Sequence, residues 1–436
     1  MNTTREKVLN ALKSVTDSEI GASIVSLGLV REIQADENGV SVGIELTTPS
    51  VGDADRIEKE AREAIAAMAP DAQVDIRVAP KLGPRKTQQD PSGLAGVKNI
   101  VAVASGKGGV GKSTVAAAMA KILAQRGYSV GLLDTDIFGP SVPSLFNRKQ
   151  PELQANEQQM AIPVEIDGLK LMSFGFVLGD NPAVMRGPMV TNYVNQFLHA
   201  VAWDELDYLF LDLPPGTGDV QLTITQQIKL DGAVVVTTPQ ALSFADVGKA
   251  ILMFDRVSVP VLGVVDNMAY FQCPTCGSRH AVFGEGAAER LKDRFGTPIL
   301  AQLPLSYDAY GGTMDHTIED NEVDGLATRV LTSLGEYSLG LERPEVDYDD
   351  NELRLTWPSG DTLSVENRKL RANCQCAVCV DEHSGERKVH YEDIDPDVKP
   401  QEIRPLGNYA LYIKWSDGHA TGFFPYKLIR EVAEQE

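Results

Sequence analysis

Residues 105–114 read Ser105-Gly106-Lys107-Gly108-Gly109-Val110-Gly111-Lys112-Ser113-Thr114, which fits the phosphate-loop pattern G-x-x-x-x-G-K-[ST]. The six residues before the loop, 99–104, are mostly apolar and predict a short buried strand. After the loop, apolar residues recur at helical spacing from Val115 to Leu123, and Gly127 marks the end of the predicted helix. A glycine-rich turn that matched by chance would lack this strand–loop–helix context. The stretch therefore predicts a nucleotide site in which backbone N–H groups surround the phosphates.

Two predicted strands after the loop end in carboxylates. The apolar run 130–133 leads into Asp134 and Asp136, and the run 208–211 leads into Asp212. In an open parallel sheet, the carboxyl ends of the strands form the edge that binds ligands. We expect Asp136 to orient the attacking water and Asp212 to hold Mg²⁺ directly or through water. Asp134 lies closer to its strand and could serve only the nearby backbone.

The remaining nucleotide contacts are expected from the loop itself and from one later glycine. Lys112 should reach the outer phosphates, and the Ser113 hydroxyl should ligate Mg²⁺ together with Asp212. Gly216, in a second glycine-rich loop, should sense the γ-phosphate through its backbone N–H. Lys107, Lys112, Asp136 and Asp212 are the expected catalytic residues. The predicted ATP-binding set also includes the rest of the loop, namely Gly106, Lys107, Gly108, Gly109, Val110, Gly111 and Thr114.

The bulk composition limits the class of protein. At 436 residues the chain is too long for one compact core, and its 43% hydrophobic and 23% charged residues are ordinary for a globular protein. A formal net charge of −21 disfavours broad binding to nucleic acid or to anionic membranes. We find no apolar run long enough to span a bilayer and no secretory segment near the start, so we expect a cytoplasmic protein.

The pattern of strands and helices divides the chain into three domains. Residues 97–341 alternate strands with helices, which predicts an α/β P-loop NTPase fold with a mostly parallel sheet and helices on both faces. Residues 1–80 predict a small α+β domain, and residues 352–436 predict a small β-rich domain. Residues 81–96 are rich in Pro, Gly, Gln and Lys, and residues 342–351 are acidic, so both are predicted to be linkers.

The five cysteines fall into two tight groups, which favours metal binding over disulfides in a cytosolic protein. One group is Cys273 with Cys276, and the other is Cys374, Cys376 and Cys379. Tetrahedral zinc and four-iron clusters both usually require four protein ligands, and the first group offers two per chain. A two-fold dimer would present that pair twice. A zinc knuckle with outside ligands and a redox disulfide remain alternatives.

The order of these motifs resembles the MinD/ParA/Mrp group of P-loop ATPases, and Mrp/ApbC-type iron–sulfur cluster carriers in particular. The resemblance rests on the phosphate loop with its early lysine, the two carboxylate strands, Asn267-Met268 and the C-x-x-C pair. It implies that Lys107 reaches across a homodimer interface and acts on the partner's nucleotide, with a solvated loop lysine as the weaker alternative. It also implies that Asn267 hydrogen-bonds the adenine edge. A role in capping a turn is an equal alternative for this asparagine.

The N-terminal domain has a resemblance of its own. The phrases 15–19, 24–30 and 46–49 resemble the small domain that often precedes Mrp-type ATPases and also occurs alone in iron–sulfur assembly proteins. Members of that family usually carry a cysteine two residues after the proline of the last phrase. Val51 stands there in this sequence, so we expect a docking or regulatory role rather than a thiolate role.

The C-terminal domain resembles the N-terminal domain of γ-butyrobetaine hydroxylase, in which a C-x-C-x-x-C cluster and a distant histidine hold zinc. The matching residues are Cys374, Cys376, Cys379 and His419. His383 is the alternative histidine, because it lies nearer in sequence. The oxygenase's iron-binding catalytic domain has no counterpart in the sequence, so hydroxylation is not expected.

The sequence therefore predicts an ATP-hydrolysing iron–sulfur cluster carrier or assembly factor. It would bind ATP with Mg²⁺ and hold a cluster, expected to be 4Fe-4S, between two chains through Cys273 and Cys276. Its expected partners are client apoproteins and the cluster-assembly machinery. One alternative is a positioning ATPase like MinD or ParA, which the C-x-x-C pair and the acidic charge disfavour. The other is a zinc-stabilised scaffold that binds nucleotide only as a switch.

Overall fold

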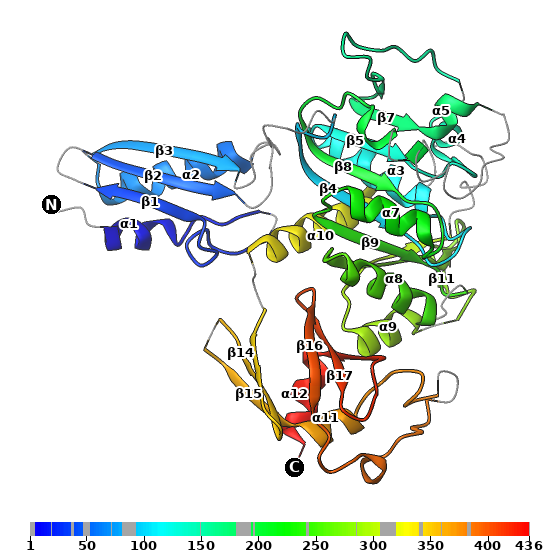
Figure 1. The fold of residues 1–436 in the computed structure, drawn as a ribbon. Coiled ribbons are helices and arrows are strands. Elements are labelled where there is room, and N and C mark those ends of the chain that lie inside the picture. Colours follow the sequence, from blue (N-terminus) through cyan, green and yellow to red (C-terminus); the bar gives the residue numbers. More distant parts are fainter. Residues whose placement is uncertain are drawn as a thin grey trace.

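The computed structural model arranges the chain as three units in sequence order (Figure 1). It describes residues 5–18, 20–35, 39–46, 53–70, 72–80, 93–148, 150–179, 193–194, 197–240, 244–284, 286–305, 320–339, 343–358, 360–381 and 385–435. Three clusters of buried apolar residues form its cores. Within those ranges, no helix has both the length and the apolar character needed to cross a membrane.

The described part of the N-terminal unit is a three-stranded sheet packed against two helices. Its elements are α1 (Arg5–Leu12), β1 (Val30–Ala35), β2 (Gly39–Leu46), α2 (Asp53–Met68) and β3 (Gln73–Pro80). The middle strand, β2, is antiparallel to β1 and parallel to β3. Its residues alternate between half-buried and buried, so one face of the sheet packs in the core. Val51 lies outside the described residues.

The central unit contains, in its described residues, a nine-stranded sheet that is mostly parallel. The order along the sheet is β11-β10-β9-β4-β8-β5-β7-β6, with β12 also paired to β10. Strands β6 and β11 run antiparallel to their neighbours. The strands are β4 (Val97–Ala104), β5 (Val130–Asp134), β6 (Val164–Ile166), β7 (Leu169–Ser173), β8 (Leu206–Asp212), β9 (Gly232–Thr237), β10 (Val261–Gln272), β11 (Arg279–His280) and β12 (Ile299–Pro304). β8 and β9 are buried along their whole length, and both are mostly apolar, as strands covered on both faces require.

Helices cover both faces of this sheet. Figure 1 shows α7 and α8 on the near side and α10 behind the sheet, where it packs beside α3. The helices are α3 (Lys112–Gln125), α4 (Val142–Leu145), α5 (Phe174–Leu178), α7 (Asp219–Gln227), α8 (Phe244–Arg256), α9 (Ala287–Phe295) and α10 (Asp320–Leu339). The predicted fold class, an α/β domain with a mostly parallel sheet between helices, is confirmed.

The C-terminal unit is β-rich, as the sequence predicts. Its described residues form two antiparallel three-stranded sheets, β13-β14-β15 and β16-β17-β18. β13 lies within the stretch 342–351, predicted to be a linker, and pairs with β14. The elements are β13 (Glu345–Tyr348), β14 (Glu352–Thr356), β15 (Thr362–Glu366), α11 (Asn367–Ala372), the short helix η2 (Tyr391–Asp393), β16 (Pro400–Leu406), β17 (Ala410–Trp415), β18 (Gly422–Pro425) and α12 (Tyr426–Glu434).

The C-terminal unit packs on α8 and α9 of the central unit. The rings of Phe295 and Phe423 meet edge to face with their centroids 5.2 Å apart. Arg404 on β16 forms an ion pair with the partly buried Asp255 on α8. The central hydrophobic core includes three residues of the C-terminal unit, namely Leu406, Ala410 and Phe423. The two units therefore share apolar packing as well as an ion pair.

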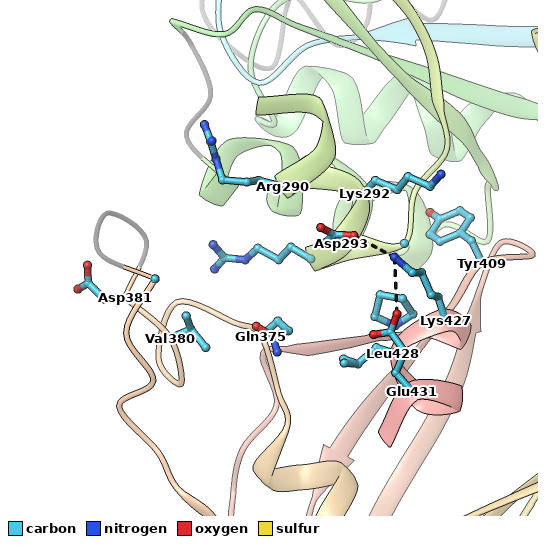
Figure 2. A pocket seen from close by; sticks show the side chains of 14 residues that line it. Arg290, Lys292, Asp293, Gln375, Val380, Asp381, Tyr409, Lys427, Leu428 and Glu431 are labelled. Atoms are coloured by element: carbon cyan, nitrogen blue, oxygen red, sulfur yellow. Dashed lines mark hydrogen bonds and ion pairs between the residues drawn. The ribbon is translucent and has the colours of Figure 1, made fainter. Parts of the chain in front are cut away.

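A cavity of about 460 Å³ opens beside this contact, between α9 and the C-terminal unit (Figure 2). Lys427 lies at its edge, 3.5 Å from the Asp293 carboxylate and 3.6 Å from the Glu431 carboxylate. Positive and negative side chains thus face each other across the cavity. The two units meet here through polar groups, in contrast to the apolar contact next to it.

Candidate nucleotide and metal sites

The phosphate loop lies between the end of β4 and the start of α3. Gly109 and Gly111 have φ angles of 80° and 79°, a region in which other residues are strained. A Cβ on Gly111 would lie 2.3 Å from the amide nitrogen of Asn267, so a larger residue would displace that side chain. The loop lines a cavity of about 520 Å³, within the size range of small-molecule sites. Other lining residues are Asp136, Gly139, Ser141, Pro215, Asn267, Met268, Pro304 and Leu305.

Lys112 and Asp212 form a buried ion pair behind the loop. Their side chains are 7% and 0% exposed, and the pair joins the start of α3 to the end of β8. Ser113 also hydrogen-bonds Asp212. Burial raises the pKa of Asp212 against the attraction of Lys112, and among the described residues its Oδ2 has no hydrogen-bond partner. A carboxylate and a hydroxyl with spare acceptor capacity are thus adjacent, and such oxygen donors fit Mg²⁺.

The two carboxylates that follow β5 are held differently. Asp134 is fully buried, accepts a hydrogen bond from the Ser173 hydroxyl at 3.0 Å, and has its pKa raised to about 7 by burial and by the nearby Asp212. Asp136 instead lies at the wall of the nucleotide cavity. Its Oδ1 accepts hydrogen bonds from the N–H groups of Phe138 and Gly139 at 3.1 and 3.0 Å. Asp134 therefore supports the local fold, and Asp136 is the carboxylate that faces the ligand space.

Asn267 and Gly216 both bond the backbone of the phosphate-binding region. The amide nitrogen of Asn267 donates to the Val110 carbonyl at 2.9 Å, and the next residue, Met268, has a φ of 57° that is uncommon outside glycine. This arrangement fits the capping alternative, and the adenine contact stays a prediction. The Gly216 N–H donates to the Ser105 carbonyl at 3.0 Å. The predicted contact of Gly216 with the γ-phosphate would require that hydrogen bond to open.

Lys107 forms an ion pair that the sequence did not predict. Its ammonium nitrogen lies 3.1 Å from the carboxylate of Asp246, near the start of α8, and the lysine side chain is 50% exposed. Lys249 lies 3.5 Å from the same carboxylate. A Cβ on Gly106 would lie 2.7 Å from the Cβ of Asp246, so the first glycine of the loop lets α8 approach closely. Asp246 belongs to no phosphate-binding motif, and no local signal in the sequence marks it.

Cys273 and Cys276 lie at the tip of a hairpin between β10 and β11. The Cys273 N–H donates to the Ser278 carbonyl at 2.9 Å, and the Gly277 N–H donates to the Cys273 carbonyl at 2.8 Å. Cys276 is exposed, and hydrogen bonding to Ser278 lowers the pKa of its thiol, which favours the reactive thiolate. The described part of the chain places no third metal-binding side chain close to this pair. Two thiols therefore converge near the surface with room for outside ligands.

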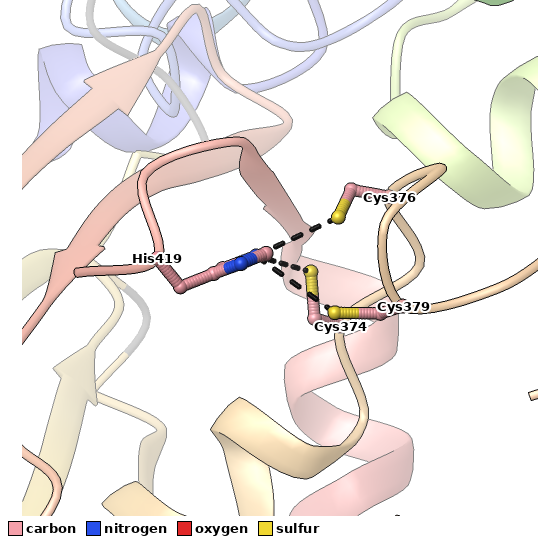
Figure 3. Close-up of side chains that lie close together, drawn as sticks. All are labelled: Cys374, Cys376, Cys379 and His419. Carbon is pink, nitrogen blue, oxygen red and sulfur yellow. Dashed lines mark hydrogen bonds between the residues drawn. The ribbon is translucent and has the colours of Figure 1, made fainter. Parts of the chain in front are cut away.

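Three cysteines and one histidine converge in the C-terminal unit, namely Cys374, Cys376, Cys379 and His419 (Figure 3). Their ligand atoms all lie within 4.8 Å of one another. The three sulfurs lie 3.3, 3.5 and 3.9 Å from Nε2 of His419. Tetrahedral zinc, with bonds of about 2.3 Å to sulfur and about 2.0 Å to nitrogen, implies sulfur–nitrogen distances of roughly 3.5 Å. The four residues therefore fit zinc, while His383 lies outside the described residues.

Outer contacts hold these four ligands in place. Arg371 is buried, lies 3.4 Å from the Cys379 sulfur, and donates to the Asp417 carboxylate at 2.9 Å. Asp417 also accepts a hydrogen bond from the backbone N–H of His419 at 2.9 Å, and the Thr421 hydroxyl donates to the Cys376 sulfur at 3.3 Å. Such contacts orient ligands and offset the charge of thiolates. Sequence reasoning missed Arg371, because no spacing rule connects an arginine on α11 to a later turn.

We expect His419→Ala to weaken zinc binding by more than about 100-fold and to lower the thermal stability of the C-terminal unit. Changes to outer contacts alone cost about 10- to 100-fold in metal affinity, so losing a ligand should cost more. Competition with a zinc chelator measures the affinity, and thermal unfolding of the full chain measures the stability. His390→Ala, at an exposed histidine of the same unit, is the control. Wild-type zinc affinity in His419→Ala would show that another residue supplies the fourth ligand.

Comparisons with known proteins agree across the chain. A ParA family model described as NUBPL iron-transfer P-loop NTPase matches residues 96–325. Models described as gamma-butyrobetaine hydroxylase-like N-terminal and as iron-sulfur cluster assembly protein match residues 345–430 and 5–76. All three matches agree with the resemblances seen in the sequence.

Two curated relatives and one solved structure illustrate the similarity. The chain is 40% identical over 446 residues to the Arabidopsis thaliana protein named Fe-S cluster assembly factor HCF101, chloroplastic, covering 99% of this chain and 83% of the relative. It is 42% identical to the iron-sulfur cluster carrier protein of Aquifex aeolicus, over 69% of this chain and 87% of the relative. A nucleotide-binding protein from Archaeoglobus fulgidus, solved with ADP, is 40% identical over 58% of this chain and 94% of its own, with a TM-score of 0.46.

Proposed function

The chain belongs to the ParA family of NUBPL iron-transfer P-loop NTPases, and from that premise we propose that it is an ATP-hydrolysing iron–sulfur cluster carrier. Two copies of the chain would hold one 4Fe-4S cluster between them and transfer it to client apoproteins, in contact with the assembly machinery. We further propose that the protein is located in the cytoplasm and that it functions as a homodimer.

The observation that carries this proposal is the exposed cysteine hairpin. Cys273 and Cys276 lie together near the surface, and the described residues add no third ligand. A four-iron cluster usually takes four cysteine ligands, and a two-fold dimer supplies them from two hairpins. The three thiols of the C-terminal unit are buried with His419 in a separate group. A cluster held between two chains would be released when the dimer opens, which suits a carrier.

The proposed hydrolysis of ATP is supported by residues that line the nucleotide cavity and by the buried Asp212 behind the loop. Lys112 would bind the outer phosphates, and the backbone N–H groups of the loop would hold the phosphate chain. Bound Mg²⁺, at Ser113 and Asp212, would supply charge neutralisation on the phosphates. Asp136 would orient a water for attack on the γ-phosphorus, with cleavage of the bond to the bridging oxygen and release of ADP and phosphate. One Asp136 oxygen is already held by two backbone N–H groups, which limits its rotation.

Lys107 supports the dimer part of the proposal. Its ammonium group lies at the rim of the nucleotide cavity and is half exposed, so a second chain could reach it. The ion pair with Asp246 is partly exposed, and such pairs contribute only about 0 to 1 kcal/mol. Exchanging Asp246 for a phosphate of the partner's nucleotide would therefore cost little. We propose that Lys107 makes this exchange when two chains meet around ATP.

Anaerobic reconstitution of the full chain tests the proposed function. The holoprotein should sediment and scatter light as a dimer and contain about four iron and four sulfide per dimer. Incubation with an apoprotein, with and without ATP, should show transfer of the cluster and its dependence on nucleotide. A holoprotein that is monomeric, or a chain that binds ATP and zinc but no iron, would contradict the carrier and support the zinc-stabilised scaffold.

A further inference from the structure

One strand, β10, carries residues of both candidate sites. Asn267 and Met268 on this strand line the nucleotide cavity, and Cys273 directly follows its last residue, Gln272. At about 3.3 Å per residue, Met268 and Cys273 are separated by roughly 16 Å along the strand. A short, hydrogen-bonded piece of backbone therefore joins the nucleotide site to the cysteine hairpin.

Tyr270 lies on this strand between the two sites and is 9% exposed. Its backbone carbonyl accepts a hydrogen bond from the Leu305 N–H at 2.6 Å, and Tyr270 is in register with Pro304 of β12. Both Pro304 and Leu305 line the nucleotide cavity. The backbone of Tyr270 therefore holds one wall of that cavity.

The side chain of Tyr270 contacts both the hairpin and α10. Its hydroxyl donates to the Glu322 carboxylate, near the start of α10. The guanidinium of Arg279, on the return strand of the hairpin, lies 4.3 Å from the centre of the Tyr270 ring and 3.4 Å from the same Glu322 oxygen. The other oxygen, Oε2, is buried without a hydrogen-bond partner in the described part of the chain. Tyr270 is buried and the Glu322 side chain is 22% exposed, so the contact between hydroxyl and carboxylate is shielded from water, whereas the Arg279 side chain is 62% exposed and its contacts are open to solvent.

We propose that Tyr270, Arg279 and Glu322 form a clamp that couples the nucleotide in the cavity to the position of the cysteine hairpin. A shift of the cavity wall at Leu305 moves the Tyr270 backbone, and the Tyr270 side chain passes this shift to Arg279, three residues after Cys276. All three clamp members are positioning residues, since none lines the nucleotide cavity or supplies a thiol. The inference rests on the proposed function, because the hairpin's position matters through the cargo that it holds.

The test uses the full chain, loaded with zinc but free of iron, so that it does not depend on cluster binding. The rate of alkylation of Cys273 and Cys276 by N-ethylmaleimide is measured by peptide mass spectrometry, with ADP and with the non-hydrolysable analogue AMPPNP. In the wild type the two rates should differ by about fivefold or more. Tyr270→Phe, which keeps the ring and loses the hydroxyl, and Glu322→Gln should bring the two rates together. A purely structural defect would instead change both rates in the same proportion.

The chain offers a matched control in its C-terminal unit. Tyr391 donates to Glu366 at 3.1 Å and lies under the guanidinium of Arg368 at 4.3 Å, so its hydroxyl and its ring make the same two kinds of contact as those of Tyr270, away from both sites. Tyr391→Phe should keep the wild-type difference between ADP and AMPPNP. Unchanged affinity for both nucleotides in Tyr270→Phe would show that the cavity itself is intact.

Two results would overturn the clamp. One is a wild-type alkylation rate that is the same with ADP and with AMPPNP, and the other is a Tyr270→Phe variant that keeps the wild-type difference. Neither result bears on the proposed function, because the iron content of the reconstituted dimer is measured separately. Conversely, a wild-type chain that binds no iron but shows the nucleotide-dependent rates would refute the carrier and keep the clamp.

Discussion

Asp136→Asn is expected to lower ATP hydrolysis by at least about 100-fold, the typical contribution of a positioned carboxylate to proton transfer. Asn keeps the oxygen that accepts hydrogen bonds from the Phe138 and Gly139 N–H groups, so the loop should retain its shape. It removes the negative charge that orients and polarises the attacking water. Phosphate release under saturating ATP measures kcat, and nucleotide affinity should stay within about threefold of wild type because Asp136 is not a predicted phosphate ligand.

Asp55→Asn serves as the control, since Asp55 is an exposed carboxylate on α2 of the N-terminal unit. It should hydrolyse ATP at the wild-type rate. If Asp136→Asn also turned over at the wild-type rate while folded, the water-orienting role would belong to another group. A parallel loss of nucleotide affinity would instead assign Asp136 to binding.

Cys273→Ser/Cys276→Ser is expected to reduce bound iron from about four atoms per dimer to near zero. Serine keeps the size of each side chain and the hairpin backbone, but it replaces the thiolates that bind iron. Zinc in the C-terminal unit should remain, because the Cys374, Cys376, Cys379 and His419 group shares no residue with the hairpin. Iron and zinc analysis of the same reconstituted sample measures both metals at once.

Thr275→Ala is the matched control for this double variant, because Thr275 is an exposed residue of the same turn. It should retain the full iron content. Full iron content in the double serine variant would move the cluster to another site, and the dimer argument would lose its basis. Retained iron in a single chain, seen by light scattering, would separate cluster binding from dimerisation.

Local motifs made the fold class and most of the candidate residues predictable. The phosphate loop, the carboxylates after two buried strands, and the C-x-C-x-x-C spacing each depend on neighbouring residues, so one sequence is enough to recognise them. In the structure these residues lie at strand ends and turns, where the motifs predict them. Asp136 lines the cavity, and Cys374 lies beside His419. The distant histidine came from a family resemblance, since sequence spacing alone also allowed His383.

Contacts between distant segments could not be predicted in this way. Asp246 pairs with Lys107 because α8 crosses beside the phosphate loop, and Glu322 reaches Tyr270 because α10 begins beside β10. Neither carboxylate belongs to a motif, and only the packed arrangement of helices on the sheet brings them there. The same holds for Arg404. Its contact with Asp255 joins the C-terminal and central units, which the sequence predicts only as two separate domains.

The shared packing of the central and C-terminal units has a consequence for cooperativity of unfolding. Leu406, Ala410 and Phe423 lie in the central core, so heat or denaturant cannot expose that core without disturbing the C-terminal unit. The N-terminal unit has its own small core, against which Leu339 at the end of α10 packs. Domains of this size bury a smaller fraction of their surface and are marginally stable. Calorimetry should therefore show an early, small heat-absorption peak from the N-terminal unit and one larger joint peak; three separate peaks would contradict the shared core.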